Sequence, residues 1–155
     1  MIEFRKVNIT DDIDTCIEFR KDSYVSSFPD SDDWKDHWDE KQYVSWLKKH
    51  ITEFPDGVWH IWNDTEIIGQ LEFAYLGENG HVNLYYLTAA NRGKGYSGAL
   101  QKHVVSVLRK KGCLFAFLRV SPTNKRARNY YEKHGWQDCG IDEKHNYVRL
   151  YKLNL

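Results

Sequence analysis

The stretch that most constrains the fold of this chain is a glycine-rich segment from Leu87 to Leu100, which reads Leu-Thr-Ala-Ala-Asn-Arg-Gly-Lys-Gly-Tyr-Ser-Gly-Ala-Leu. An extended apolar run ends here and an amphipathic helix begins, so the chain passes from strand to helix through a tight turn. The glycines can adopt backbone angles that other residues avoid, which lets several N–H groups converge on one point. The helix start adds unpaired N–H groups and the positive end of the helix dipole. The segment therefore predicts a phosphate site.

Two common phosphate motifs fit this segment poorly. Residues 93–98 satisfy the G-x-G-x-x-G pattern of dinucleotide sites, but that pattern also requires an acidic residue about 20 positions later. Residues 113–117 occupy that region and include no acid. A Walker loop needs Gly-Lys followed by Ser or Thr, and the sequence contains no such run.

The segment resembles motif A of the GNAT N-acetyltransferase family, in which Arg or Gln is followed by two residues, Gly, one residue, and Gly or Ala. Arg92 and Gly95 match the fixed positions, and Ser97 departs from the last one. Serine is small enough to keep the backbone near a pyrophosphate. The resemblance implies that acetyl-CoA is the cofactor.

A second motif lies downstream at the right distance. Asn124, Ala127, Tyr131 and Gly135-Trp136 reproduce the family pattern Asn-x-x-Ala-x-x-x-Tyr-x-x-x-Gly-aromatic. The resemblance covers the last half of the chain closely and the first half by its order of elements. The cofactor-binding residues that it implies are Leu87, Thr88, Arg92, Gly93, Lys94, Gly95, Tyr96, Ser97, Gly98, Asn124, Ala127 and Tyr131.

Three of these positions have a chemical role in the family. Tyr131 is at the position that usually protonates the coenzyme A sulfur; the alternative is that it only fills the core. Asn124 is similar to the residue that reaches the pantetheine arm, and it could instead cap its helix. Leu87 contributes its backbone, which in the family binds pantetheine and polarises the acetyl carbonyl.

The general base is predicted from the strand that leads into the glycine-rich segment. Counting by twos from Leu87 places His81, Asn83 and Tyr85 on one face, while Val82, Leu84 and Tyr86 lie on the other. His81 falls where some family members have a glutamate base, and histidine titrates near neutrality. A histidine near a turn can also be merely solvated, and a bulge would reverse the parity. Glu72 on the preceding strand is the second candidate.

The acceptor site is predicted at the start of a helix near residue 33. Acidic residues between Asp30 and Glu40 surround Trp34, His37 and Trp38. In the family this region commonly walls the substrate cleft, and acids with aromatic rings suit a cationic amine. We therefore expect Trp34, Asp36 and Trp38 to bind substrate, although the helix dipole alone would also gather acids here.

Periodicity predicts the remaining elements. The helices are expected after a cap at 10–12, from about 33 to 50, from about 95 to 111, and after a cap at Asn124. Strands are expected at 2–7, 57–62, 66–76, 81–87, 113–120, 136–141 and 145–153. We expect one domain, 1–155, with the α/β GNAT fold: a mixed, mostly antiparallel sheet of about seven strands with helices on both faces.

Composition restricts the classes of partner and cofactor that we expect. Basic and acidic residues number 22 each, which does not favour nucleic acid as a partner or an anionic membrane surface. The three cysteines are widely spaced, as in reduced cytoplasmic proteins, and no metal-ligand spacing or membrane span is apparent.

We expect direct acetyl transfer to a primary amine of a small cationic molecule or of a protein or peptide, by a monomer or homodimer. The alternatives are a non-catalytic acyl-CoA-binding sensor or interaction domain and a nucleotide-binding domain.

Overall fold

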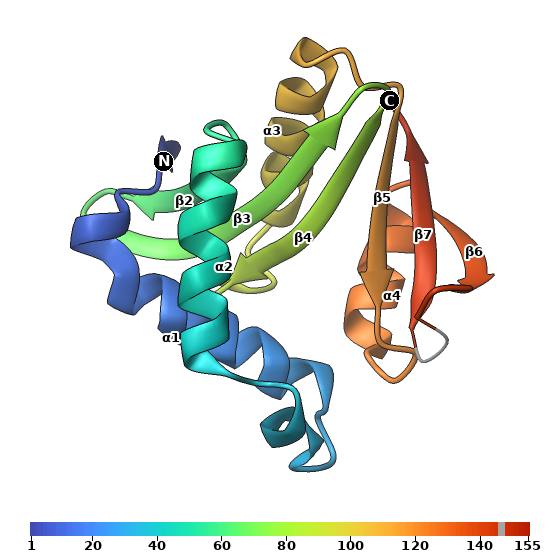
Figure 1. Ribbon diagram of the computed structural model, residues 1–155, viewed down its shortest axis with the longest axis horizontal. Coiled ribbons are helices and arrows are strands. Elements are labelled where there is room, and N and C mark those ends of the chain that lie inside the picture. Colours follow the sequence, from blue (N-terminus) through green and yellow to red (C-terminus); the bar gives the residue numbers. More distant parts are fainter. Residues whose placement is uncertain (146–147) are drawn as a thin grey trace.

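The computed structural model describes residues 1–145 and 148–155, which form a seven-stranded sheet in the order β1-β2-β3-β4-β5-β7-β6 (Figure 1). In chain order the elements are β1 (Ile2–Lys6), α1 (Ile9–Ser27), the 3₁₀ helix η1 (Asp33–Asp36), α2 (Glu40–Glu53), β2 (Val58–Asn63), β3 (Glu66–Leu76), β4 (Asn79–Leu87), the 3₁₀ helix η2 (Ala89–Asn91), α3 (Ser97–Lys110), β5 (Phe115–Val120), α4 (Lys125–Lys133), β6 (Gln137–Ile141) and β7 (Arg149–Asn154). The predicted final strand began at 145, and its residues 146–147 lie outside the described residues.

The sheet is mixed, as predicted. Among the described strands, β4 and β5 pair in parallel and all other neighbours pair antiparallel. The parallel pair needs a crossover, and α3 provides it. Figure 1 shows α1 and α2 on one face of the sheet and α3 on the other. The expected fold class is confirmed.

Apolar side chains fill both sides of the sheet. On one side Leu100, Val104 and Leu108 of α3 pack on the sheet, and on the other Cys16 of α1 and Leu47 of α2 are fully buried. These residues recur at helical spacing, so each helix buries one stripe. The sheet is therefore covered on both faces, and its polar groups reach solvent mainly at edges and ends.

Strands β4 and β5 pair over only part of their length. The parallel register joins Asn79–Val82 to Phe115–Leu118 and stops there. Beyond Val82 the two strands diverge into a V, which Figure 1 shows opening away from the start of both strands. The fold therefore leaves one side of residues 83–87 without a neighbouring strand.

A bulge in β4 changes which side chains of that strand lie on the same face of the sheet. Glu72 lies opposite Leu84 and Phe73 lies opposite Val82, so Asn83 is the extra residue. Val82 packs in the core under α3, whereas Leu84 packs with Phe19 of α1.

The prediction that Val82 shares a face with Leu84 and Tyr86, and that His81 shares one with Tyr85, was therefore wrong. Simple alternation fails across an inserted residue.

Two helix starts also differ from the prediction. The first cap is Asn8, whose side chain accepts from the N–H groups of Thr10 and Asp11, so the helix begins at Ile9. The second predicted helix is divided, because Asp39 has extended backbone angles and caps α2 through the N–H of Gln42. Each start follows the residue whose side chain satisfies the first free amides.

Candidate active site

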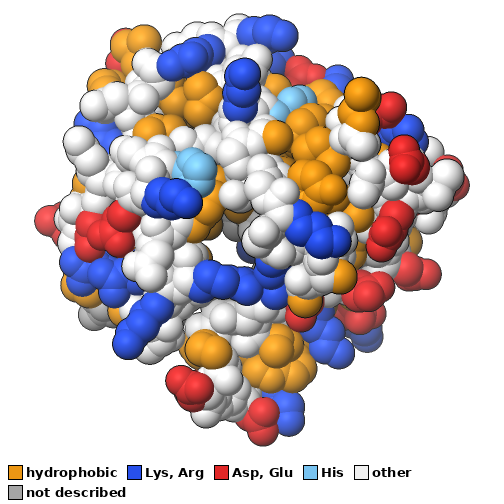
Figure 2. Space-filling model, turned by 180° about the vertical axis from the view of Figure 1, so that it is seen from behind, with side chains coloured by type: hydrophobic (Ala, Val, Ile, Leu, Met, Phe, Trp, Pro, Cys, Tyr) orange, Lys and Arg blue, Asp and Glu red, His pale blue; other side chains and the backbone are white. Residues whose placement is uncertain are grey.

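A pocket of about 990 Å³ occupies the V between β4 and β5. It is bounded by the end of α1, the second half of β4, the start of α3, the end of β5 and the start of α4. Figure 2 shows a hollow from the α3 side, with Lys and Arg side chains along its rim. The pocket exists because β4 and β5 separate beyond Val82, which exposes backbone that a paired strand would cover.

The glycine-rich segment forms one end of this pocket. Gly93 and Gly95 have φ of 75° and 85°, a region that disfavours residues with a side chain. A Cβ placed on Gly93, Gly95 or Gly98 would have no atom within 4 Å, so the space in front of these residues is open. Helix α3 begins at Ser97 without a side-chain cap. Its first amides and dipole are available to an anion.

Two arginines lie beside the glycine-rich segment, and they differ in their hydrogen bonds. Arg92 donates through Nε to the carbonyl of Leu87 at 2.8 Å, and its Nη2 lies 3.4 Å from the carboxylate of Asp22. Arg126 makes no hydrogen bond or ion pair with the described residues and lines the pocket. Burial, and then the charge of Arg92, lowers the pKa of Arg126. An anion placed between these arginines would relieve their repulsion.

Sequence reasoning missed both Asp22 and Arg126. Arg126 immediately precedes Ala127 in the second motif, so a basic residue at the start of that helix was a usable signal. Asp22 had no such signal, because its link to Arg92 joins residues 70 positions apart.

Tyrosines line the wall next to α4. Tyr131 packs against Tyr85 and Trp136, with ring centroids 6.0 and 5.9 Å apart. Burial raises the pKa of Tyr131, so its hydroxyl stays protonated at neutral pH. The neighbouring Tyr130 instead donates to the carbonyl of Ser97 at 2.7 Å. The hydroxyl of Tyr85 is buried and has no partner among the described residues.

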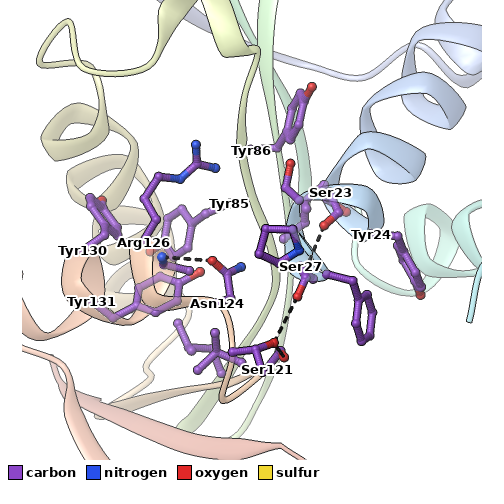
Figure 3. A pocket seen from close by; sticks show the side chains of 18 of the residues that line it. Ser23, Tyr24, Ser27, Tyr85, Tyr86, Ser121, Asn124, Arg126, Tyr130 and Tyr131 are labelled. Carbon is purple, nitrogen blue, oxygen red and sulfur yellow. Dashed lines mark hydrogen bonds between the residues drawn. The ribbon is translucent and has the colours of Figure 1, made fainter. Parts of the chain in front are cut away.

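Figure 3 shows Asn124 and Arg126 at the start of α4 and Tyr131 near its end pointing into the pocket, opposite Ser27 of α1. Asn124 accepts the N–H of Ala127 at 3.2 Å, so it does cap its helix. That bond uses only the side-chain oxygen. The Asn124 amide N–H groups remain able to donate into the pocket.

The other predicted cofactor residues surround the same turn. Leu87 ends β4 with its carbonyl held by Arg92, and Thr88 accepts the side chain of Asn91 at 2.7 Å. Lys94 is exposed, and Tyr96 packs against the core under α3. The structure thus brings parts of both motifs to one pocket. The predicted cofactor residues that line it are Leu87, Arg92, Gly93, Ser97, Asn124, Ala127 and Tyr131, and those that do not are Thr88, Lys94, Gly95, Tyr96 and Gly98.

His81 lies near the pocket wall and is bound to a residue that lines it. Its Nε2 is 2.6 Å from Arg119 Nη1, and Arg119 Nε donates to Asp142 at 2.5 Å. Burial, and then the charge of Arg119, lowers the pKa of His81. The ring is therefore neutral at pH 7.

Glu72, the second base candidate, is fully buried away from the pocket lining. Its carboxylate accepts from Arg20 at 3.0 Å, Tyr43 at 2.5 Å and Gln70 at 2.7 Å. A carboxylate with these three donors has little capacity left for a substrate proton. The geometry favours a structural role for Glu72.

The predicted acceptor residues Trp34, Asp36 and Trp38 do not line the pocket, whereas their neighbours Asp30 and Asp33 do. Trp38 packs against Tyr24 and Tyr43, between α1 and α2. The acidic stretch does reach the pocket, but through other residues than those expected.

Comparisons with known proteins agree with this geometry. The family model of the acetyltransferase (GNAT) family matches residues 13–136, which include both motifs. No curated protein sequence gives a significant match. Among the described residues, no helix has the length and apolar character to span a membrane, and no cluster of three or more His, Cys, Asp or Glu side chains could hold a metal.

Solved structures share the fold. The PaiA N-acetyltransferase from Thermoplasma acidophilum, crystallised with coenzyme A, has a TM-score of 0.86 and 21% identity, covering 100% of this chain and 99% of that one. An N-acetyltransferase from Staphylococcus aureus Mu50 has a TM-score of 0.74 and 12% identity, covering 99% and 98%. The NatC complex bound to Gag peptide and coenzyme A has a TM-score of 0.68 and 14% identity, covering 99% and 98%.

Proposed function

The chain belongs to the acetyltransferase (GNAT) family, and we propose that it transfers the acetyl group of acetyl-CoA directly to a primary amine. The observation that carries this proposal is the pocket in which the open glycine turn and the half-buried Tyr131 meet between diverging strands. A phosphate anchor and a proton donor on one continuous wall are what acyl transfer from a thioester carrier requires.

The residues present fit the cofactor. The open turn at Gly93 and Gly95, together with the uncapped start of α3, suits a diphosphate. Arg92 and Arg126 add positive charge beside it. The unpaired edge of residues 83–87 offers N–H and C=O groups to the amide-rich pantetheine arm, as a neighbouring strand would. Asn124 donates to the same arm through its side-chain amide.

Two residues handle protons. When bound, acetyl-CoA supplies the acetyl group as a thioester. Tyr131 keeps its proton because burial raises its pKa, and it donates that proton from its hydroxyl to the departing sulfur. An amine with a pKa near 10.4 is neutral in only about one molecule in two thousand at pH 7, so a proton acceptor is needed. His81 is the proposed acceptor: the one lone pair of its neutral ring is on Nε2 and accepts from Arg119 at 2.6 Å, so this bond must open before Nε2 takes the proton through water.

The acceptor enters beside the acidic stretch. Asp30 and Asp33 line the pocket and form no ion pair with the described residues, so they favour a cationic amine. The structurally similar NatC complex was crystallised with a bound peptide, so a peptide amine is the other acceptor class that we propose. The three cysteines are free thiols, which supports a reducing compartment such as the cytoplasm.

Thiol release from acetyl-CoA across a panel of polyamines, amino acids, aminoglycosides and peptides tests the proposal. We expect turnover with a cationic amine, and Tyr131→Phe should lower kcat about 100-fold while coenzyme A still binds. Tyr130→Phe is the matched control, because that hydroxyl is already bound to Ser97; it should stay within about threefold of wild type.

A non-catalytic acyl-CoA-binding domain is the second candidate. It is favoured by one observation, which is that neither His81 nor Glu72 lines the pocket. Tight binding of coenzyme A by calorimetry, with no turnover of any amine in the panel, would establish it instead.

A further inference from the structure

The bulge in β4 presents a backbone carbonyl that the sheet does not use. Asn83 has no register partner on β3, and the pairing with β5 stops at Val82. The sheet therefore leaves the carbonyl of Asn83, an exposed residue at the edge of the pocket, free to accept from a side chain. The donor comes from a helix: Arg20 of α1 donates through Nη1 to the Asn83 oxygen at 3.0 Å.

The same Arg20 nitrogen is also tied to the most deeply buried carboxylate of the core. Nη1 donates to Glu72 Oε1 at 3.0 Å, and Glu72 is completely inaccessible to solvent. Each of the two protons on Nη1 therefore has one acceptor. Arg20 is itself largely buried, with 17% of its side chain exposed, and lies within 6.0 Å of the ring centroids of Tyr24, Tyr43 and Trp46.

Glu72 cannot move to follow Arg20. Its other oxygen accepts from Tyr43 of α2 and from Gln70, and Gln70 in turn contacts His60 at 2.8 Å. These side chains come from α2, β2 and β3, so the carboxylate is fixed by three elements. A charge-assisted hydrogen bond from a group held this firmly fixes the position of its partner.

We infer that Arg20 is a positioning residue that sets the divergence of β4 from β5. It joins the rigid Glu72 cluster to the carbonyl at which the strand changes direction, immediately before residues 84–87. Those residues belong to the pocket edge that the proposed function assigns to the pantetheine arm, so the inference rests on that proposed function. Arg20 itself lines the pocket, and the role inferred for it here acts through the backbone carbonyl of Asn83.

The predicted consequence is a loss of turnover with little loss of cofactor affinity. The glycine turn that anchors the diphosphate is separate from Arg20, so the Kd for coenzyme A should change by less than about threefold. Misplacement of the reacting group by about 1 Å costs on the order of 100-fold in rate. We expect kcat to fall about 10- to 100-fold when Arg20 no longer reaches Asn83.

Two variants separate positioning from stability. Arg20→Lys keeps a positive charge beside Glu72 but lacks the guanidinium fork, so one ammonium must replace both contacts. The double variant Arg20→Met with Glu72→Gln removes both charges together and avoids an unpaired buried carboxylate. Tyr43→Phe is the matched control, because it removes another donor to Glu72 and leaves the Asn83 contact in place.

The readouts are kcat, the Kd for coenzyme A, and amide hydrogen exchange in the cofactor-free protein. Both Arg20 variants should lose kcat and show faster exchange at residues 83–87 by about tenfold, while Tyr43→Phe retains wild-type values for both. The inference is overturned if exchange at 83–87 is unchanged, or if Tyr43→Phe loses as much kcat as the Arg20 variants. If the wild type turns over no amine, the proposed function fails and hydrogen exchange still decides the role of Arg20.

Discussion

Burial sets the protonation of the two side chains to which we assign proton transfer. It raises the pKa of Tyr131 and lowers that of His81, and each shift favours the neutral form. A neutral phenol can donate a proton and a neutral imidazole can accept one. The same physical cause therefore prepares opposite roles at two positions.

His81 predicts a pH dependence. Because its pKa is lowered from 6.5, His81 is neutral above that value and becomes protonated as the pH falls through the lowered pKa. We expect kcat/KM to decline on that acid side, where the base is lost. His81→Gln should lower kcat/KM about 10- to 100-fold at pH 7 and flatten the acid limb.

A series of kcat/KM measurements from pH 5 to pH 8 checks this prediction. His134→Gln, at the end of α4, is the control and should keep the wild-type profile. An unchanged acid limb in His81→Gln would assign the base to another group.

For individual residues, the sequence was sufficient to identify pocket residues that belong to one of the two motifs. Arg92, Asn124 and Tyr131, which the family resemblance singles out, all line the pocket, and their roles stay predictions. Arg20 and Asp22 could not be found, because their roles depend on contacts with strands more than 50 positions away. Such contacts leave no local pattern in the chain.

Among the elements, the glycine turn and the start of α3 are those that we propose to bind the cofactor. Gly95 and Gly112 offer a matched comparison, since both have φ of 85° and neither has an atom within 4 Å of the place that a Cβ would take. Gly112 follows the end of α3, and Gly95 precedes its start. The two positions carry equal backbone strain but differ in what they face.

Gly95→Ala and Gly112→Ala should each destabilise the protein by about 1 kcal/mol, because an L-residue disfavours this backbone region. Only Gly95→Ala should weaken coenzyme A binding, by about tenfold or more, since its methyl group occupies the space before the turn. Thermal unfolding and calorimetry measure the two effects. Equal coenzyme A affinity in both variants would contradict a role for this turn.

Helix α4 allows capping to be separated from cofactor binding at Asn124. Asn124→Asp keeps an oxygen for the N–H of Ala127 and removes the amide donors, so stability should be retained while coenzyme A binds several-fold more weakly. Asn124→Ala should lose both, with about 1 kcal/mol of stability. Chemical denaturation and calorimetry on the two variants test this. Wild-type affinity in Asn124→Asp would leave capping as the residue's role.

Whether a segment forms a helix or a strand was predictable, because the spacing of apolar residues shows which side chains are buried. All seven strands were expected, and β3 matches its predicted range of 66–76. The bulge at Asn83 was not predictable, because it depends on pairing with β3. The break before Asp39 was missed because acidic residues with capping ability follow one another there, and the sequence does not say which one caps.

Across the whole molecule, buried histidines lie on both sides of the sheet. His50 on α2 and His60 on β2 are buried, and His103 on α3 is partly buried and stacked on Phe4 with ring centroids 4.1 Å apart. Burial lowers the pKa of all three below 6.5. The unfolded chain therefore binds more protons than the folded one as the pH falls below about 6.5.

The contribution of these histidines to the free energy of unfolding should therefore be complete above pH 6.5. It should decrease as the pH falls from 6.5 through the lowered pKa values. His103 Nε2 is buried without a partner among the described residues, so His103→Phe removes one of these groups at little packing cost. We expect the variant to lose less Tm than wild type between pH 8 and pH 5, as measured by calorimetry at both pH values. Equal losses in the two proteins would show that His103 does not contribute.

The proposal as a whole depends on main-chain amides of residues 93–98 holding the diphosphate of acetyl-CoA at the start of α3. The decisive measurement is a crystal structure of the protein with coenzyme A. We expect diphosphate oxygens within about 3.2 Å of these amides, with Arg126 turned toward them. If the diphosphate instead bound elsewhere and made no contact with residues 93–98, the proposed cofactor site would be wrong.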